Sequence, residues 1–289
     1  MFLESASNNA LARAREIAYA LELTSDFDAQ AEIDRRIGFL HDYLRHSSTR
    51  ALVLGISGGV DSSTAGRLCQ MAVERAREAG YEARFVAMRL PYGIQRDEHD
   101  CQRALAFIRP DITLAVNIKP ASDAMLESLR AAGHSFADAV QQDFVLGNIK
   151  ARQRMIAQYA VAGSHAGLVV GTDHAAEAVM GFFTKFGDGG CDLTPLTGLN
   201  KRRVRALATQ LGASPELVHK IPTADLEELR PQLPDEQSYG ISYQQIDDFL
   251  ECLPVAPEVS AKIINYYQRT EHKRAVPVTP RAWAQMRTG

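Results

Sequence analysis

Short apolar runs alternate with stretches of helical periodicity through most of this chain. Four such runs, each bounded by turn-forming or charged residues, predict strands over 51–56, 84–90, 112–118 and 167–171. The periodic stretches predict helices over 28–46, 61–79, 96–108, 121–131, 136–162, 173–183, 201–211 and 257–271. Apolar strands separated by helices are typical of a parallel sheet covered on both faces. The pattern therefore predicts an α/β fold.

The regular pattern weakens between residues 186 and 240, where glycines and prolines recur. We interpret 186–240 as a loop-rich cover over a site, not as a second domain. Residues 1–25 are expected to form an N-terminal helical extension, and 257–289 a C-terminal helix and tail. The whole of 1–289 is thus predicted to be one domain.

The composition fits an enzyme of the cytoplasm. Of the 289 residues, 46% are apolar, which is ample for a core. The net charge of −3 and the lack of a long basic tract argue against a nucleic-acid partner. No apolar run has membrane-spanning length and no signal pattern opens the chain, so we expect no membrane association. The 4 cysteines are scattered, which indicates reduced thiols.

The strongest chemical signal is the Ser-Gly-Gly-Val-Asp-Ser-Ser segment, residues 57–63, after the first predicted strand. Gly58 and Gly59 let the backbone turn tightly and bring its amides against a ligand. The following helix start adds unpaired N–H groups and the positive end of a dipole, which together form an anion site. Hydroxyl donors come from Ser57, Ser62 and Ser63, and Asp61 is suited to hold a divalent cation. The alternative is an ordinary capped turn; a Walker-type loop is excluded because no lysine follows Gly59.

A second polar cluster, residues 171–177, follows the fourth predicted strand. Because ligands bind beyond the carboxyl ends of parallel strands, the turns at 57–63 and 171–173 should line one crevice. Thr172 is interpreted as the helix cap, which places Asp173 and Glu177 on one helical face. Two carboxylates facing an anion site suit Mg²⁺, whereas the alternative is a solvated acidic face. Zinc is excluded because His-x-x-Glu has no completing ligand.

Two basic residues remain open to either a structural or a ligand-binding interpretation. Lys185 lies beside a glycine-rich acidic loop that suits a ligand with ribose hydroxyls and a ring, or is simply a surface loop. Arg152 projects from the side of the 136–162 helix that carries Val145, Ile149, Ile156, Tyr159 and Ala160, whereas Lys150 and Arg154 point almost opposite. Arg152 therefore either pairs with a structural carboxylate or reaches a site next to this helix.

The motifs together resemble a known family. The Ser-Gly-Gly-x-Asp-Ser loop is similar to that of the ATP pyrophosphatases, which cleave ATP between the α and β phosphates. Longer segments stand at 90–93, 171–178, 181–190, 199–202, 222–226 and 270–274. With the loop, these segments resemble the ammonia-dependent NAD synthetases, in order and from about residue 20 to the end.

This resemblance implies a Rossmann-like domain of the adenine nucleotide alpha hydrolase-like fold. It also implies a homodimeric ligase that converts deamido-NAD, ATP and ammonia into NAD, AMP and pyrophosphate through an adenylate, with Mg²⁺. The segments 91–97 and 221–238 are the expected lids over this intermediate, because bulk water would hydrolyse it.

The resemblance also assigns residues. The ATP contacts it implies are Gly55, Ile56, Ser57, Gly58, Gly59, Val60, Asp61, Ser62, Thr172, Lys201 and Thr223. The metal ligands are Asp61 and Glu177, and the deamido-NAD contacts are Arg152, Lys185, Asp192, His272 and Lys273. Asp61 and Lys201 are expected to act in catalysis, with Asp173 as the base that deprotonates ammonium. Val60 stands where close relatives usually carry glutamine.

Three other functions are compatible with an ATP-pyrophosphatase-type loop. A glutamine-dependent NAD synthetase needs a glutaminase domain, for which the chain has no room. Another ATP pyrophosphatase, such as a tRNA-modifying enzyme, would predict basic extensions or paired cysteines, and neither is present. A non-catalytic nucleotide sensor would be favoured by loss of Asp61 or Glu177, and both are present.

Overall fold

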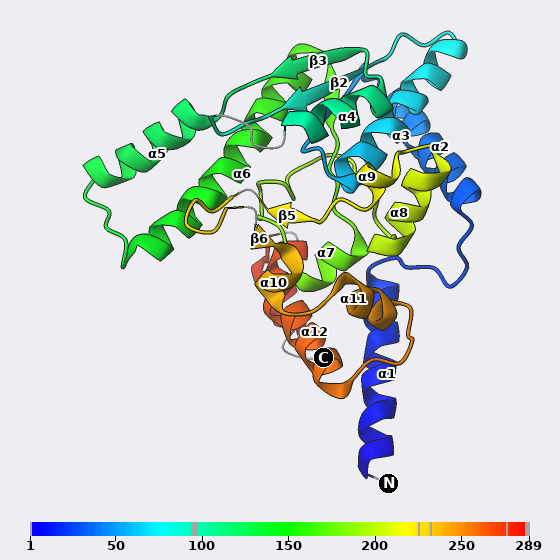
Figure 1. Cartoon of the computed structure of the whole chain (residues 1–289), viewed down its shortest axis with the longest axis vertical. Helices are drawn as coiled ribbons and strands as arrows, with labels where there is room; N and C mark the ends of the chain where they lie inside the picture. The colour runs from blue at the N-terminus through cyan, green and yellow to red at the C-terminus, as the bar shows by residue number, and fades with distance from the viewer. Residues whose placement is uncertain (1, 94–97, 225, 232, 276, 287–289) are drawn as a thin grey trace.

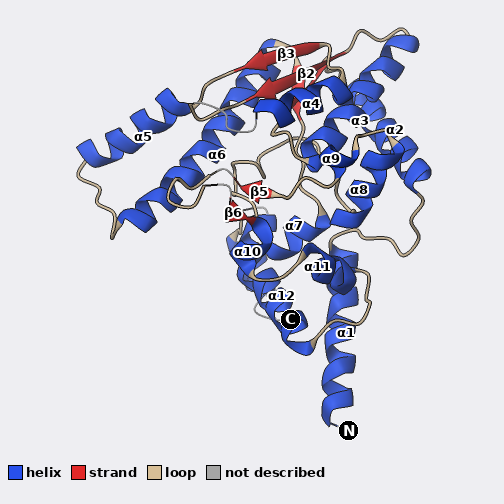
Figure 2. Ribbon diagram, viewed as in Figure 1, coloured by secondary structure: helices blue, strands red, loops and turns tan. Residues whose placement is uncertain are grey.

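The computed structural model describes residues 2–93, 98–224, 226–231, 233–275 and 277–286. Its centre is a parallel sheet of four strands in the order β3-β2-β1-β4 (Figures 1 and 2). The strands are β1 (Ala51–Gly55), β2 (Arg84–Arg89), β3 (Ile112–Ala115) and β4 (Gly167–Val169). Each lies within a strand predicted from the apolar runs, so the predicted parallel α/β sheet is confirmed.

The central position of β1 explains its unbroken apolar sequence. Leu52 and Val53 are fully buried, one on each face of the sheet, because side chains alternate along a strand. Val53 lies opposite Val86 of β2 and Val169 of β4 in the parallel register. By contrast, β3 lies at an edge and its side chains are alternately exposed.

Helices cover both faces of the sheet. On one face a large apolar cluster joins Leu52 and Phe85 to helices on that side. Its helices are α2 (Ala29–His46), α3 (Val60–Glu78), α4 (Glu98–Ile108), α8 (Lys201–Gln210) and α9 (Pro215–Val218). On the other face Val53 and Val86 pack against Ala162 of α6 (Ala139–Ser164), and α5 (Lys119–Ala131) packs on α6.

A second apolar cluster lies below the sheet in the view of Figure 1 and consists of helices. Apart from Leu21 and Ile241, its members come from α1 (Phe2–Ala20), α7 (Ala175–Met180), α10 (Asp235–Tyr239), α11 (Tyr243–Leu250) and α12 (Pro257–Arg269). The chain ends in two short helices, α13 (Glu271–Arg274) and α14 (Pro280–Met286). No described helix is both long and apolar enough to cross a membrane.

The segment 186–240 contains more regular structure than its glycines and prolines indicate. Besides α8, α9 and α10, it forms a two-stranded antiparallel hairpin of β5 (Thr223–Ala224) and β6 (Leu233–Pro234). Of the two expected lids, residues 94–97, 225 and 232 lie outside the described residues. The division of the chain into one domain with a cover and tail stays a prediction.

The strand order fixes the place of the site. From β1 the chain proceeds to β2 and β3 on one side, and it later returns to β4 on the other side of β1. Such a reversal opens a crevice at the carboxyl ends of the two strands that flank it. These are β1, which leads into residues 56–59, and β4, which leads into residues 170–174.

Candidate functional site

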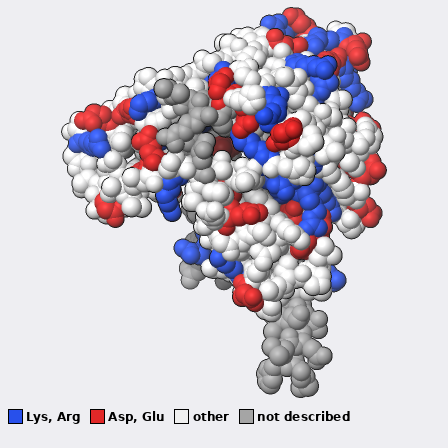
Figure 3. All heavy atoms as spheres, in the orientation of Figure 1, with Lys and Arg blue, Asp and Glu red and all other residues white. Residues whose placement is uncertain are grey.

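A crevice of about 560 Å³ lies at this reversal and falls within the usual range of ligand pockets, ~300–1000 Å³. Ser57, Asp61, Thr172 and Glu177 line it, so the two polar turns do share one crevice as predicted. Acidic and basic side chains are interspersed over the face of the molecule shown in Figure 3.

The glycine loop after β1 leads into a helix start that no side chain caps. Gly58 has φ of +81°, and a Cβ there would lie 2.9 Å from the backbone nitrogen of Cys101, so only glycine fits. Gly59 is the N-cap residue of α3, and no side chain caps this helix. The first turn of α3 is therefore open to an anionic ligand.

The three serines of the loop have different roles. The hydroxyls of Ser57 and Ser62 lie 3.1 Å apart and both residues line the crevice. Ser63 is fully buried and its hydroxyl donates to the Gly59 carbonyl at 2.7 Å. The prediction that Ser63 offers a hydroxyl to a ligand is therefore wrong, because the helix turn takes that donor.

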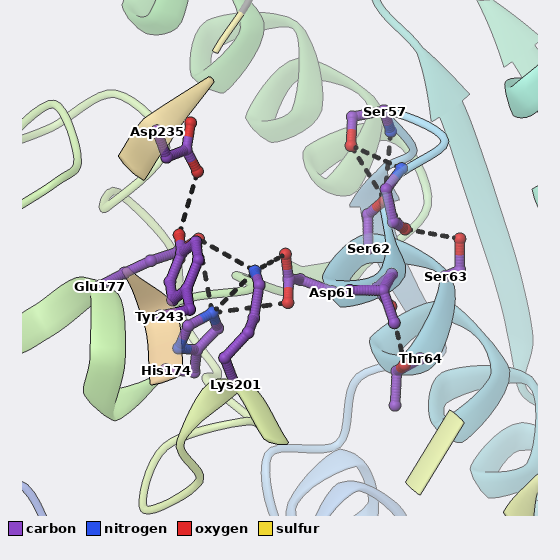
Figure 4. Close-up of polar contacts among 12 residues, drawn as sticks. Ser57, Asp61, Ser62, Ser63, Thr64, His174, Glu177, Lys201, Asp235 and Tyr243 are labelled. Carbon is purple, nitrogen blue, oxygen red and sulfur yellow. Dashed lines mark hydrogen bonds and ion pairs between the residues drawn. The ribbon is translucent and has the colours of Figure 1, made fainter. Parts of the chain in front are cut away.

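Four charged side chains from three elements meet at the floor of the crevice (Figure 4). Lys201, at the start of α8, is fully buried, and its Nζ lies 2.7 Å from Asp61 Oδ2 and 3.9 Å from Glu177 Oε1. His174 Nε2 lies 3.4 Å from both Asp61 Oδ1 and Glu177 Oε1, and 3.3 Å from Lys201 Nζ. The cluster thus pairs two carboxylates with two nitrogen bases.

The pKa shifts in this cluster follow from burial opposed by opposite charge. Burial alone would raise the pKa of Asp61, but Lys201 and His174 outweigh it and hold that pKa below its usual range. Burial alone would lower the pKa of Lys201, but Asp61 and Glu177 together raise it. Glu177 likewise leads the effects that raise the pKa of His174 against burial. Asp61 is therefore ionised and Lys201 is charged.

The donor set fits a divalent cation. Asp61 Oδ1 is buried and accepts no hydrogen bond from any described residue, and Asp61 and Glu177 both line the crevice. The exclusion of zinc rested on a missing third ligand, and the fold supplies one, because atoms of Asp61, His174 and Glu177 lie within 4.8 Å of one another. However, the Lys201 ammonium already lies within 3.9 Å of all three residues, including the His174 nitrogen that zinc would need, which favours oxygen ligation by the carboxylates over a three-ligand zinc site.

Two expectations for the turn after β4 are wrong. Helix α7 begins at Ala175 with His174 as its N-cap residue, so Thr172 is not the cap. Asp173 precedes the helix and does not share a helical face with Glu177. Asp173 does not line the crevice, and its Oδ1 is buried without a hydrogen-bond partner among the described residues. Burial, followed by the charge of Glu177, raises the pKa of Asp173 to about 7.

Of the other residues expected to contact ATP, some line the crevice and some do not. Crevice-lining positions are occupied by Gly55, Ile56, Gly59, Val60, Ser62 and Thr223. Gly58 and Lys201 do not line the crevice: Gly58 shapes the loop, and Lys201 lies behind Asp61.

The residues expected at deamido-NAD form a chain of contacts beside the crevice. Arg152 Nη2 donates to the Lys185 carbonyl at 3.2 Å, and Lys185 Nζ donates to the His272 carbonyl. Lys273 lines the crevice and donates to the carbonyls of Gly181 and Phe183, both at 2.8 Å.

Asp192 lies apart from that chain of contacts. Its carboxylate accepts from the Val169 amide at 2.7 Å and from the Tyr159 hydroxyl at 3.1 Å. Tyr159 stands two turns along α6 from Arg152, so Asp192 and Arg152 lie along the same exposed side of that helix.

The side of α6 that carries Arg152 is not the covered side. Ile156 is 52% exposed, whereas Lys150, assigned to the opposite side, is only 3% exposed. The apolar stripe read from the sequence is therefore largely an outer surface of the chain, and Arg152 is exposed on it. Arg152 has no carboxylate among its described contacts. The alternative that Arg152 pairs with a structural carboxylate is therefore not supported.

Several residues in the crevice or beside Lys201 carried no signal in the sequence. Gln158 accepts from the Gly55 amide at 2.7 Å, and Arg154 donates to the Leu90 carbonyl at 3.1 Å. The Tyr243 ring lies 4.6 Å from Lys201 Nζ, and its hydroxyl is 3.0 Å from Asp235. The capping box of Ser242 and Gln245 marks the start of α11. This sequence signal could have placed Tyr243 in the first turn of a helix.

Comparisons with known proteins agree with this geometry. The NAD synthase family model matches residues 32–277. An NH(3)-dependent NAD(+) synthetase of Burkholderia mallei is 67% identical over 252 residues, which cover 87% of this chain and 89% of that relative. The crystal structure of an NAD+ synthetase from Burkholderia pseudomallei matches with a TM-score of 0.81 and 63% identity over 93% of this chain and 98% of that one.

An NMN synthetase from Francisella tularensis also matches, with a TM-score of 0.76 and 32% identity over 88% of this chain and 99% of that one. The family model covers most of the chain, and the 67% identical relative is matched over nearly its full length. The open helix start beneath the Ser-Gly-Gly loop and the buried Asp61–Lys201 pair thus belong to a member of the NAD synthase family.

Proposed function

We propose that this crevice carries out the ammonia-dependent amidation of deamido-NAD to NAD, a ligase reaction that forms a C–N bond at the expense of ATP. The observation that carries the proposal is the position of Asp61. It stands in the first turn of α3, below the uncapped glycine loop, and it is held from behind by the buried Lys201. A nucleotide phosphate bound at the loop would therefore lie next to a cation bound at Asp61.

The proposed reaction has two steps. The nicotinate carboxylate of deamido-NAD attacks the α-phosphorus of ATP, an O–P bond forms, and pyrophosphate leaves. Ammonia then attacks the activated carbonyl carbon, AMP leaves with the bridging oxygen, and the nitrogen loses a proton. The loop amides and the α3 dipole stabilise charge that develops on the phosphates. Lys201 stabilises it through Asp61, which it holds in place.

We assign Asp61 and Glu177 as the residues that would hold Mg²⁺. When bound, the ion supplies positive charge that polarises the phosphate oxygens. The other ATP contacts are assigned to the crevice-lining residues Gly55, Ile56, Ser57, Gly59, Val60, Ser62, Thr172 and Thr223.

We keep Asp173 as the proposed base: it does not line the crevice itself but directly follows Thr172, which does, and a carboxyl with a pKa of about 7 is matched to proton transfer near neutrality. It must be ionised to act, so turnover at constant free ammonia should rise with pH through about 7. A pH–rate profile that is unchanged in Asp173→Asn would remove Asp173 from the mechanism.

The exposed side of α6 supports a homodimer. Phe144 and Ile156 are 58% and 52% exposed, and with Tyr159 they form an apolar stripe that needs a cover. We propose that a second copy packs there, which would place Arg152 and Asp192 near the subunit boundary. Sedimentation equilibrium tests this, and Ile156→Glu should shift the protein to monomer.

The proposed function predicts a definite set of substrates and products. Purified protein with deamido-NAD, ATP, Mg²⁺ and ammonium should form NAD, AMP and pyrophosphate, and glutamine should not replace ammonium. With deamido-NAD labelled by ¹⁸O in the nicotinate carboxylate, mass spectrometry should find one label in AMP. Label in orthophosphate together with ADP would contradict adenylation. Nicotinate mononucleotide is the control substrate, and preference for it would shift the assignment to NMN synthesis.

Arg152→Ala should raise the KM for deamido-NAD by about 10- to 100-fold, the scale of a hydrogen bond to a charged group, and leave the KM for ATP within about twofold. The fold should persist, because Arg152 is exposed and its described contact is one hydrogen bond to a carbonyl. Steady-state kinetics with each substrate varied separately measures this. Arg50→Ala, which removes an exposed arginine bonded to Glu82, is the control. Equal changes in both KM values would argue against a deamido-NAD contact.

A further inference from the structure

Lys150 is a buried lysine that the proposed chemistry does not use. It lies on α6 with only 3% of its surface exposed. Its Nζ donates to the Leu226 carbonyl at 3.0 Å, lies 3.7 Å from a Glu228 carboxylate oxygen, and stands 3.9 Å from the centre of the Tyr92 ring. A buried ammonium is costly unless such groups compensate its charge. Lys150 thus connects α6 to two segments that are far apart in the sequence.

Asp143 makes a matching attachment two turns earlier on the same helix. Its carboxylate accepts from the amides of Glu228 and Leu229 at 2.8 and 2.9 Å, and the residue is 7% exposed. Gly147 stands between the two charged residues, and a Cβ there would lie 3.2 Å from the Leu226 Cβ. Helix α6 therefore offers residues 143, 147 and 150 as one stripe on which the segment 226–229 rests.

Both attached segments form walls of the crevice. Tyr92 lines it from the turn after β2, and Leu226, Glu227 and Arg230 line it from the segment after β5. Displacement of either segment would widen access to the crevice. If water reaches an acyl-adenylate, its oxygen bonds to the carbonyl carbon, AMP leaves, a proton is released, and deamido-NAD is regenerated without amidation.

We propose that Lys150 and Asp143 are positioning residues that hold residues 91–93 and 226–229 against α6 and so keep water from the adenylate. This inference rests on the proposed function for its chemical consequence, but not for its geometry. The two residues touch neither substrate in the proposed mechanism.

The consequence is measured as uncoupling. Wild-type protein should form about one AMP per NAD, and Lys150→Met and Asp143→Asn should raise this ratio at least about fivefold, as expected for loss of one charge-assisted hydrogen bond. In H₂¹⁸O, label should also appear in the carboxylate of recovered deamido-NAD. Lys262→Met is the matched control, because exposed Lys262 also donates to a backbone carbonyl, that of Gly240 at 3.4 Å.

A second measurement does not depend on the reaction. The Glu228 side chain is 56% exposed within the attached segment. A glutamate-specific endoprotease should cleave after Glu228 about tenfold faster in ligand-free Lys150→Met and Asp143→Asn than in wild type or Lys262→Met, because local opening sets the cleavage rate. Lys150→Gln, which keeps a donor, should be intermediate, and thermal unfolding identifies any variant that fails to fold.

The two measurements separate the inference from the function on which it builds. Absence of NAD from the wild-type reaction would overturn the proposed function, and the comparison of proteolytic cleavage after Glu228 would still decide the positioning role. If folded Lys150→Met and Asp143→Asn show wild-type cleavage and a wild-type AMP-to-NAD ratio, these residues only pack the helix and the inference is wrong.

Discussion

Asp61→Asn should fold and should lose at least about 10² in turnover, the scale for removal of one strong electrostatic contact at a reacting centre. Asparagine keeps the shape of the side chain in the first turn of α3, but it removes the negative charge that faces Lys201 at 2.7 Å. It also removes Oδ1 as a charged ligand for a cation. Turnover should be measured at limiting and at saturating Mg²⁺, with Mn²⁺ binding followed by calorimetry as a readout independent of activity.

Glu177→Gln should behave in the same direction, because its carboxylate lines the same crevice. Asp34→Asn, at an exposed position of α2, is the control for loss of one negative charge. Near wild-type turnover of both site variants at limiting Mg²⁺ would mean that the carboxylates have only a structural role with Lys201.

The sheet could be predicted from the sequence because its buried strands are short, continuous apolar runs. Leu52 and Val53 face opposite sides of the sheet and both are fully buried, so β1 has to be apolar at every position. The short helix α11 carried a weaker signal, since eight residues give barely two turns of periodicity. Its capping box was readable, but its tertiary role, which places Tyr243 against Lys201, depends on chain packing.

Residues named by a family motif do come together in the structure, whereas a contact inferred only from spacing along the chain does not. Asp61 and Glu177 come together from different elements, as the family motifs imply. The pairing of Asp173 with Glu177 failed because a spacing of four places residues on one face only inside a helix, and α7 begins at Ala175. His174, given no role, instead lies between the two carboxylates.

The side of α6 that faces the core could not be predicted from the sequence. Apolar residues occur all around it, so periodicity could not tell which side faces the core. Lys150 is buried because partners from residues 92 and 226–228 reach it, and no local pattern contains that information. Ile156 is exposed, on the side where the proposed second subunit would pack.

Lys201→Met should cost more than any other single change at the site, because it acts on both activity and stability. Methionine fills a similar volume but leaves the Asp61 carboxylate without its closest counter-charge. Breaking a buried ion pair from one side costs about 3–5 kcal/mol in the free energy of unfolding. Turnover should fall at least about 10³-fold, since Asp61 is no longer held in its ionised position.

The stability loss should depend on pH in a direction set by Asp61. Its folded-state pKa lies below the unfolded value of 3.8, so in wild type it contributes stability that is present above about pH 4 and is lost on acidification. In Lys201→Met the pKa of Asp61 should rise, and that contribution should disappear. Urea unfolding should therefore show the largest difference between the two proteins near pH 7 and a smaller one below about pH 4.

The double variant Asp61→Asn/Lys201→Met distinguishes a broken pair from a packing defect. If the cost of Lys201→Met comes from an unpaired carboxylate, replacing that carboxylate by an amide should recover part of the free energy of unfolding at pH 7, while turnover stays at the level of the single variants. Strictly additive losses would mean that Lys201 stabilises the fold through its packing against Tyr243 and not through Asp61. The charge pair at the floor of the crevice would then not be the device that positions the proposed metal ligand.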